Sequence, residues 1–172
     1  RCQFTVHLAP RAESEPNTRG AEVVEFLIST NPGTPAGSLK KIASGGELSR
    51  ISLALQVAAS ENVTAPTMVF DEVDVGIGGG VAEVVGQLLR QLADKVQVIC
   101  VTHLGQVAAQ GQLHLQVTKA SKGTRTHTTL LPLSAEARVQ EIARMVGGID
   151  ITETSLAHAK DMLDRASAEP MS

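Results

Sequence analysis

Two short apolar runs, each followed at once by polar residues with reactive side chains, constrain the fold of this chain more than any other feature. Residues 68–70 precede Asp71 and Glu72, and residues 96–101 end just before His103, with Thr102 between them. The intervening residues 81–92 carry apolar side chains at helical spacing. A strand–helix–strand order favours parallel strands joined by a right-handed crossover. The polar residues would then lie at the carboxyl edge of one sheet, where open α/β folds bind ligands.

The rest of the chain adds further strands and helices to this pair. Alternating apolar residues predict half-buried strands at 4–8 and 24–28, and helical spacing predicts helices over about 47–60 and 104–109. A hairpin is expected from residues 113–118 and 125–131, followed by helices capped by Ser134 and Thr152. The predicted fold is therefore one α/β domain over residues 1–172, with a mainly parallel sheet flanked by helices, a late β-hairpin and C-terminal helices.

The composition is that of a globular domain. Of the 172 residues, 42% are apolar and 19% are charged, which is too apolar for a disordered segment. A net charge of −3 gives no general attraction to nucleic acid, and no apolar stretch approaches the length of a membrane span. With three Phe and no Tyr or Trp, a base-stacking surface is not expected. Cys2 and Cys100 lie in apolar runs and are expected to be buried thiols of a reducing cytosol.

A capping motif precedes the first predicted helix. Ser44-Gly45-Gly46-Glu47 has the spacing at which a Ser hydroxyl and a Glu carboxylate satisfy each other's backbone amides. The two glycines would also let a phosphate approach the amides at the positive end of the helix. Taken alone, the motif is more often just a well-capped helix. The carboxylates that follow the next strand favour a phosphate site.

The carboxylates and glycines at residues 71–80 allow more than one interpretation. Asp71 and Glu72 could hold a metal ion and polarise water, or could only form a turn that caps the next segment. The glycines at 76 and 78–80 look like a dinucleotide loop, but Val81 stands where its last glycine or alanine belongs. No G-x-x-x-x-G-K-[ST] P-loop occurs anywhere in the sequence. The chain therefore carries only part of a nucleotide site.

The remaining polar residues are less informative. His103 follows a predicted buried strand, where a lone histidine is more often a satisfied cap than a ligand. The other four histidines have no pairing with cysteine at zinc-ligand spacing. Basic residues near the predicted hairpin form a small cluster, for which a solvated face is the default and DNA contact a weaker hypothesis. This cluster comprises Lys119, Lys122 and Arg125.

In this order and spacing the motifs resemble the second half of an ABC-type ATPase head. Residues 44–47 match the signature loop, 71–72 the Walker B end with its glutamate, 74–80 the D-loop, and His103 the switch histidine. A closer resemblance rests on residues 25–28, 31–33, 39–50, 70–79 and 101–109. In these segments the chain is, within that superfamily, most similar to the C-terminal head segment of the RecN family of bacterial DNA repair proteins, relatives of the SMC proteins. The resemblance covers roughly residues 22–150, and Glu47 argues against a transporter ATPase, which usually has Gln there.

The resemblance implies roles for individual residues. Asp71 would hold Mg²⁺ through water, and Glu72 would polarise the water that attacks ATP. His103 would contact the γ-phosphate, and Asp74 would help to bind the nucleotide and to align two sites across a dimer. The signature residues would bind the γ-phosphate of ATP held by the opposite subunit; these are Ser44, Gly45, Gly46 and Glu47.

It also implies partners. An N-terminal P-loop lobe, joined through a coiled coil, would complete the head, and two heads would form a homodimer acting on double-stranded DNA in double-strand break repair and recombination. We expect a cytoplasmic, nucleoid-associated protein without a membrane partner. The chain starts at Arg1, is expected to be a piece of a longer protein, and should be inactive alone. The alternatives are another SMC-like or transporter-type head, or a nucleotide-gated DNA clamp that does not hydrolyse ATP.

Overall fold

The computed structural model describes residues 3–11, 18, 20–29, 33, 35–38, 45–59, 65–122, 125–148 and 150–168, the side chains of 121, 122 and 125 excepted. The chain divides into two compact units, residues 1–48 and 49–172.

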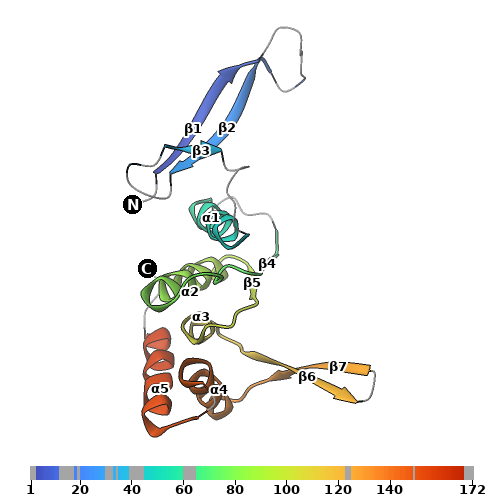
Figure 1. Ribbon diagram of the computed structural model, residues 1–172, viewed down its shortest axis with the longest axis vertical. Coiled ribbons are helices and arrows are strands. Elements are labelled where there is room, and N and C mark those ends of the chain that lie inside the picture. Colours follow the sequence, from blue (N-terminus) through green and yellow to red (C-terminus); the bar gives the residue numbers. More distant parts are fainter. Residues whose placement is uncertain are drawn as a thin grey trace. The chain divides into compact units, whose positions relative to one another are not determined.

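The first unit contains a three-stranded antiparallel sheet in the order β1-β2-β3 (Figure 1). Its strands are β1 (Gln3–Pro10), β2 (Glu22–Ser29) and β3 (Gly37–Ser38). The Phe4 and Phe26 rings lie 5.5 Å apart across β1 and β2. The prediction that these two strands are half-buried was wrong, because most of their apolar side chains have no described segment of the same unit packed against them. The exposed set is Phe4, Val6, Leu8, Val23, Val24 and Phe26.

The second unit is built on a strand–helix–strand crossover. Strands β4 (Thr67–Phe70) and β5 (Gln97–Cys100) are parallel and are joined by α2 (Gly79–Ala93). Their register runs from Thr67 opposite Gln97 to Phe70 opposite Cys100. This is the parallel arrangement predicted from the two apolar runs, and among the described strands it is the one parallel pair. Helix α1 (Gly45–Ala58) begins in the first unit and continues into the second.

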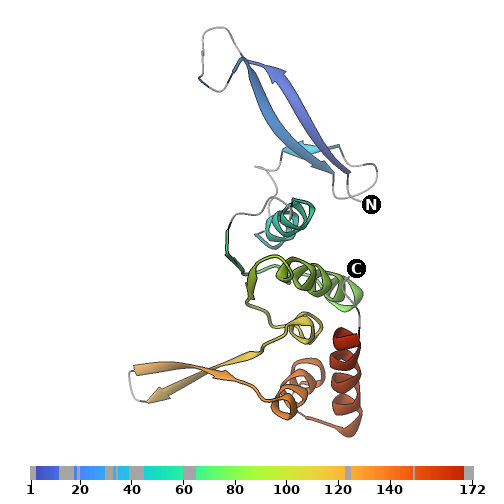
Figure 2. The ribbon, with the colours of Figure 1, turned by 180° about the vertical axis from the view of Figure 1, so that it is seen from behind.

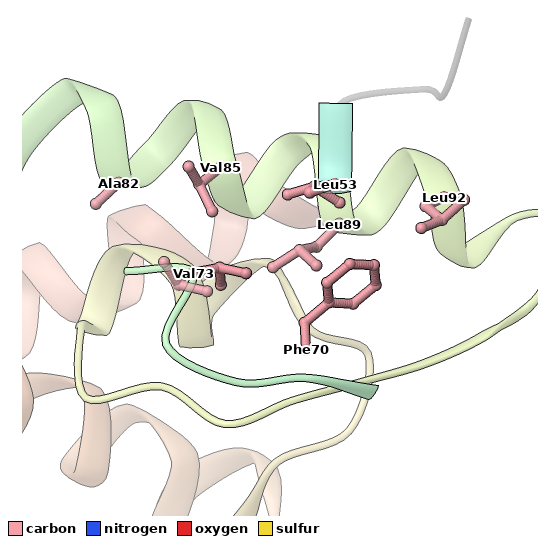
Figure 3. Packing of buried hydrophobic residues seen from close by; sticks show 8 residues of the cluster. Leu53, Phe70, Val73, Ala82, Val85, Leu89 and Leu92 are labelled. Atoms are coloured by element: carbon pink, nitrogen blue, oxygen red, sulfur yellow. The ribbon is translucent and has the colours of Figure 1, made fainter. Parts of the chain in front are cut away.

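A hydrophobic core fills the space between α2 and the two strands (Figure 3). Helix α2 contributes residues at helical spacing, and Phe70 of β4 and Leu53 of α1 pack with them. Alternate strand residues therefore face opposite ways, with Phe70 in the core while Val69 is 67% exposed and its neighbour Ile99 is 46% exposed. The buried cluster comprises Leu53, Phe70, Val73, Ala82, Val85, Leu89, Leu92 and Val107.

The remainder of the second unit is a helical layer with a projecting hairpin (Figures 1 and 2). Helices α3 (Gly105–Gln110), α4 (Ala135–Gly147) and α5 (Glu153–Ala168) contact one another around a small core of Ala109, Ile142, Ala143 and Ala159. The predicted hairpin is present as β6 (Leu115–Lys122) and β7 (Arg125–Pro132). None of the described helices is long and apolar enough to cross a membrane.

Both predicted helix caps in this region are confirmed. Ser134 Oγ accepts a hydrogen bond from the Ala137 amide at 3.2 Å, and Thr152 Oγ1 accepts one from the Ser155 amide at 3.1 Å. Each cap satisfies an amide that the first turn of a helix leaves without a partner. The caps fix where α4 and α5 begin.

Candidate functional site

The polar residues that follow β4 and β5 lie beside each other. The Val101 amide donates a hydrogen bond to the Phe70 carbonyl at 2.9 Å, which carries the strand pairing to the last residue of β4. Asp71 begins one connecting segment just beyond this bond, and Thr102 begins the other. The site predicted at the carboxyl edge of the sheet is therefore a meeting of two loops, each held at its base by the ladder.

Asp71 and Glu72 are both exposed at this edge. The Asp71 carboxylate accepts a hydrogen bond from the Glu72 amide at 2.9 Å. Glu72 has a φ of +61°, and among the described residues it is the one non-glycine with a positive φ. A left-handed backbone costs a non-glycine residue about 1–2 kcal/mol. The strain is thus placed at the residue predicted to be catalytic, and it turns the chain sharply after Asp71.

The turn that follows is held by Arg50 of α1. Arg50 Nη1 donates to the Val75 carbonyl at 2.8 Å and to the Val73 carbonyl at 3.4 Å. Within the turn, the Val75 amide donates to the Glu72 carbonyl at 3.3 Å. The guanidinium of Arg50 therefore binds main-chain carbonyls of this turn.

Asp74 is only 2% exposed, and one of its carboxylate oxygens accepts from the other loop. Asp74 Oδ2 lies 2.5 Å from the Thr102 hydroxyl, 3.0 Å from the His103 amide nitrogen and 3.2 Å from His103 Nδ1. The sequence singled out Asp74 as part of a nucleotide-contacting loop, which stays a prediction. Thr102 was not assigned a role, although a hydroxyl at the end of a strand is a common hydrogen-bond donor.

The residues of the predicted signature loop belong to the first turn of α1. Gly45, Gly46 and Glu47 are helical, and Glu47 places a negative charge near the positive end of the helix. Ser44 lies outside the described residues, and so does the predicted capping box that depends on it. The three described residues fall in the first unit, whereas the carboxylates and His103 fall in the second.

Cys100 ends β5 directly behind these loops. It is a free, half-buried thiol, and burial raises its pKa to about 12, with smaller contributions from the charges of Asp74 and Asp71. A thiol in this state is protonated and unreactive at neutral pH. The expectation of a buried thiol is met in part at this position, and Cys2 lies outside the described residues.

The carboxylates do not form a complete metal cage by themselves. Among the described residues no group of three His, Cys, Asp or Glu side chains lies close enough to hold a metal ion. Mg²⁺ in nucleotide sites takes one or two carboxylates, water, and oxygens of the substrate phosphates. An exposed Asp71 at the strand end fits that manner of binding, as a single protein ligand.

The basic cluster predicted near the hairpin lies at its far end. Lys119 is exposed on β6, and Lys122 pairs with Arg125 in the last register position before the turn. His114, which the sequence left unassigned, lies at the other end of β6, where burial, and then Arg138, lowers its pKa.

Similarity to known proteins identifies the segment. No family model matches the chain. Over 161 residues, 94% of its length, it is 52% identical to the DNA repair protein RecN of Xylella fastidiosa. The chain corresponds to the C-terminal head segment of the RecN family. RecN proteins of Vibrio cholerae and Bacillus subtilis are 50% and 41% identical over 95% of the chain. The chain spans about 30% of the length of these RecN relatives.

Solved structures agree with the fold expected for a RecN head. The Smc head domain of Pyrococcus yayanosii superimposes with a TM-score of 0.57 at 19% identity, covering 81% of this chain and 25% of that one. A structure from work on ATP-driven dimerisation of SMC ATPases gives 0.53 at 18% identity, covering 86% of this chain and 83% of that one. The predicted fold class, the C-terminal lobe of an SMC-type head, is therefore confirmed.

Proposed function

We propose that this chain is the C-terminal lobe of an ATP-hydrolysing, SMC-like head that acts in DNA double-strand break repair. The observation that carries the proposal is the pairing of two loops at one edge of the β4–β5 ladder. One loop presents the exposed carboxylates of Asp71 and Glu72, and the other presents His103. The RecN relatives, named as DNA repair proteins, support the biological setting.

The residues suit phosphoryl transfer to water. Bound Mg²⁺ would neutralise charge on the phosphates, and Asp71, exposed just beyond β4, would hold it. Glu72 would orient the attacking water; its side chain is exposed just beyond β4, where its backbone has a positive φ. His103 would contact the γ-phosphate from the neighbouring loop. Gly45, Gly46 and Glu47, with Ser44, would bind ATP held by the opposite subunit of a homodimer.

The outer face of the β4–β5 ladder supports an N-terminal P-loop lobe as partner. Parallel sheets are normally covered on both faces. Here α2 covers one face, whereas Val69, Ile99 and Val101 of the other face are exposed, and no described segment of the second unit packs against them. A lobe carrying the missing P-loop would bury these side chains and complete the nucleotide site. On this proposal, the chain by itself hydrolyses no ATP.

The setting within the cell follows from the same proposal. The complete protein would be cytoplasmic and associated with the nucleoid, and its head dimer would act on double-stranded DNA. DNA contact would depend on the basic cluster of the hairpin, of which Lys119 is exposed. Reversing the charges of the hairpin residues, Lys119, Lys122 and Arg125, in the full-length protein should lower the salt dependence of DNA binding. Unchanged salt dependence of DNA binding would show that these hairpin residues do not contact DNA.

The deciding experiment is ATP hydrolysis by the full-length protein that contains this chain. Glu72→Gln should abolish ATP turnover but leave ATP binding intact. It should therefore trap head dimers in the presence of ATP, which light scattering would detect. Glu83→Gln replaces an exposed glutamate of α2 and is the matched control, expected to hydrolyse ATP normally. Normal turnover in Glu72→Gln would contradict the assignment of Glu72. ATP-dependent dimers without any turnover in the unsubstituted protein would favour a non-hydrolysing DNA clamp.

A further inference from the structure

The carboxylate of Asp74 is buried and contacts uncharged donors and one imidazole. A buried carboxylate is costly unless it is hydrogen-bonded and paired. Among the described residues, no lysine or arginine forms an ion pair with Asp74, and the one ion-pair contact is His103 Nδ1 at 3.2 Å. The contacts of the Asp74 carboxylate are therefore all with the loop that follows β5.

All three contacts fall on the same oxygen, Asp74 Oδ2. The Thr102 hydroxyl donates to it at 2.5 Å and the His103 amide at 3.0 Å. Thr102 Oγ1 in turn accepts from the Leu104 amide at 3.0 Å, which closes the loop around residue 103. The oxygen that accepts from the backbone amide of His103 therefore also lies 3.2 Å from Nδ1 of its ring.

The charge on Asp74 Oδ2, 3.2 Å from Nδ1, favours one of the two neutral forms of the His103 ring. A neutral imidazole has one N–H donor and one lone pair. A lone pair on Nδ1 would face a negatively charged oxygen, so the proton belongs on Nδ1 and the lone pair on Nε2. The His103 side chain is 68% exposed, and among the described residues Nε2 has no hydrogen-bond partner. The free nitrogen is available to a ligand.

We propose that Asp74 is the positioning residue of His103, fixing the tautomer and the orientation of its ring so that Nε2 meets the substrate. The inference rests on the proposed function for the identity of the substrate, a nucleoside triphosphate. It differs from the prediction made from the sequence, in which Asp74 itself helps to bind nucleotide. Asp74 is buried and does not contact the substrate itself; it affects the substrate only by positioning His103.

The kinetic test uses the full-length protein and a double-mutant cycle. Asp74→Asn keeps the shape of the side chain and removes its charge. Misplacing a reacting group lowers kcat on the order of 10- to 100-fold, and we expect a fall of this size with KM for ATP changed less than about threefold. In a His103→Ala background, Asp74→Asn should have no further effect, since the residue through which it acts is gone. His158→Ala replaces an exposed histidine of α5 as control.

Three outcomes of this cycle would overturn the proposal. They are an unchanged kcat in Asp74→Asn, an effect that multiplies with that of His103→Ala, and a rise in KM for ATP at constant kcat. The last result would restore Asp74 to direct nucleotide binding. If the unsubstituted protein hydrolyses no ATP, the proposed function fails, and the position of the ring is decided by the second measurement.

That measurement is the ¹⁵N NMR spectrum of the imidazole nitrogens in full-length protein labelled on histidine, with His103 assigned by its loss in His103→Ala. The neutral His103 ring of the unsubstituted protein should show a protonated Nδ1 and a bare Nε2. A protonated Nε2 there would overturn the proposal, even if Asp74→Asn does not fold. Where Asp74→Asn folds, the ring should shift toward the Nε2–H form, which a purely structural role of Asp74 would not produce.

Discussion

Arg50 donates from Nη1 to the carbonyl oxygen of Val75 at 2.8 Å, so the helix that begins at the glycine motif holds the turn that follows the two carboxylates. The two residues are 25 positions apart in the sequence. A change in the turn that moved the Val75 carbonyl away from Arg50 would break this bond. Through Arg50, the position of α1 is linked to that of Glu72.

Replacing Arg50 by Ala should loosen this turn. A partly exposed hydrogen bond to a charged donor contributes about 1 kcal/mol, so we expect a local loss of stability of that order. Hydrogen–deuterium exchange of the full-length protein should show faster exchange of the amides at residues 73–77. Arg165→Ala removes an exposed arginine of α5 and should leave these amides unchanged. Equal exchange in Arg50→Ala and the unsubstituted protein would contradict the link.

Gly105 should not tolerate a side chain. A Cβ at this position would lie 2.6 Å from Val146 Cγ2, where α3 meets α4. Overpacking of this kind costs about 1–3 kcal/mol, so Gly105→Ala should lower the thermal midpoint. The matched control is Gly80→Ala in the first turn of α2, where a Cβ would meet open space. If Gly105→Ala and Gly80→Ala had the same midpoint of thermal unfolding, α4 would be able to move aside at no cost.

Glu141 should contribute stability that depends on pH. Its pKa is lowered, chiefly by the hydrogen bonds from Arg144 at 2.6 and 2.8 Å, and Gln116 donates a further one at 2.8 Å. The contribution is therefore complete above the ordinary pKa of 4.5 and is lost as the pH falls through the lowered value. Thermal midpoints of unsubstituted protein and Glu141→Gln should differ at pH 7 and converge toward pH 3. A difference that is constant with pH would contradict this account.

Cys100 should resist alkylation at neutral pH. Because burial and two nearby carboxylates raise its pKa to about 12, the reactive thiolate is scarce. Iodoacetamide labelling followed by mass spectrometry should show slow modification in the folded protein and fast modification in urea. Asp74→Asn removes one of the raising charges and should accelerate the folded reaction. Rapid labelling of unsubstituted folded protein would show that the thiol is not shielded.

The sequence predicted those elements whose determinants are local. The crossover from β4 through α2 to β5 follows from two apolar runs and a helical spacing, all carried within 35 residues or so of chain. The caps at Ser134 and Thr152 follow from a hydroxyl placed before an apolar periodic stretch. Such features depend on neighbours a few positions away, and a single sequence contains them.

The burial of β1 and β2 depends instead on what packs against them. The alternation of Phe4 and Val6 with polar residues correctly indicates a strand, but an apolar side chain is buried only where another surface covers it. The sequence of one segment does not include that surface. The same limit explains why Val69 and Ile99 are exposed in a strand pair whose other face is well packed.

The sequence was enough to predict which residues belong to the candidate site, but not which of them contact one another. Asp71, Glu72, Asp74 and His103 stand out in the sequence, whereas the contact between Asp74 and His103 joins positions 29 apart and depends on the strand register. The positive φ of Glu72 was equally hidden, because a glutamate gives no sign of a left-handed backbone. These contacts are properties of the assembled loops.

A newly made copy of this segment that has not met a covering surface would be a client for chaperones and proteases. Among the described strands, β4 and β5 pair only with each other, and Val69, Ile99 and Val101 form an exposed apolar strip along one side of the ladder. In a cell, the lifetime of such a segment would be set by how quickly that strip is covered. Substitutions in this apolar strip would then change the abundance of the protein in the cell even where they left its catalytic activity unchanged.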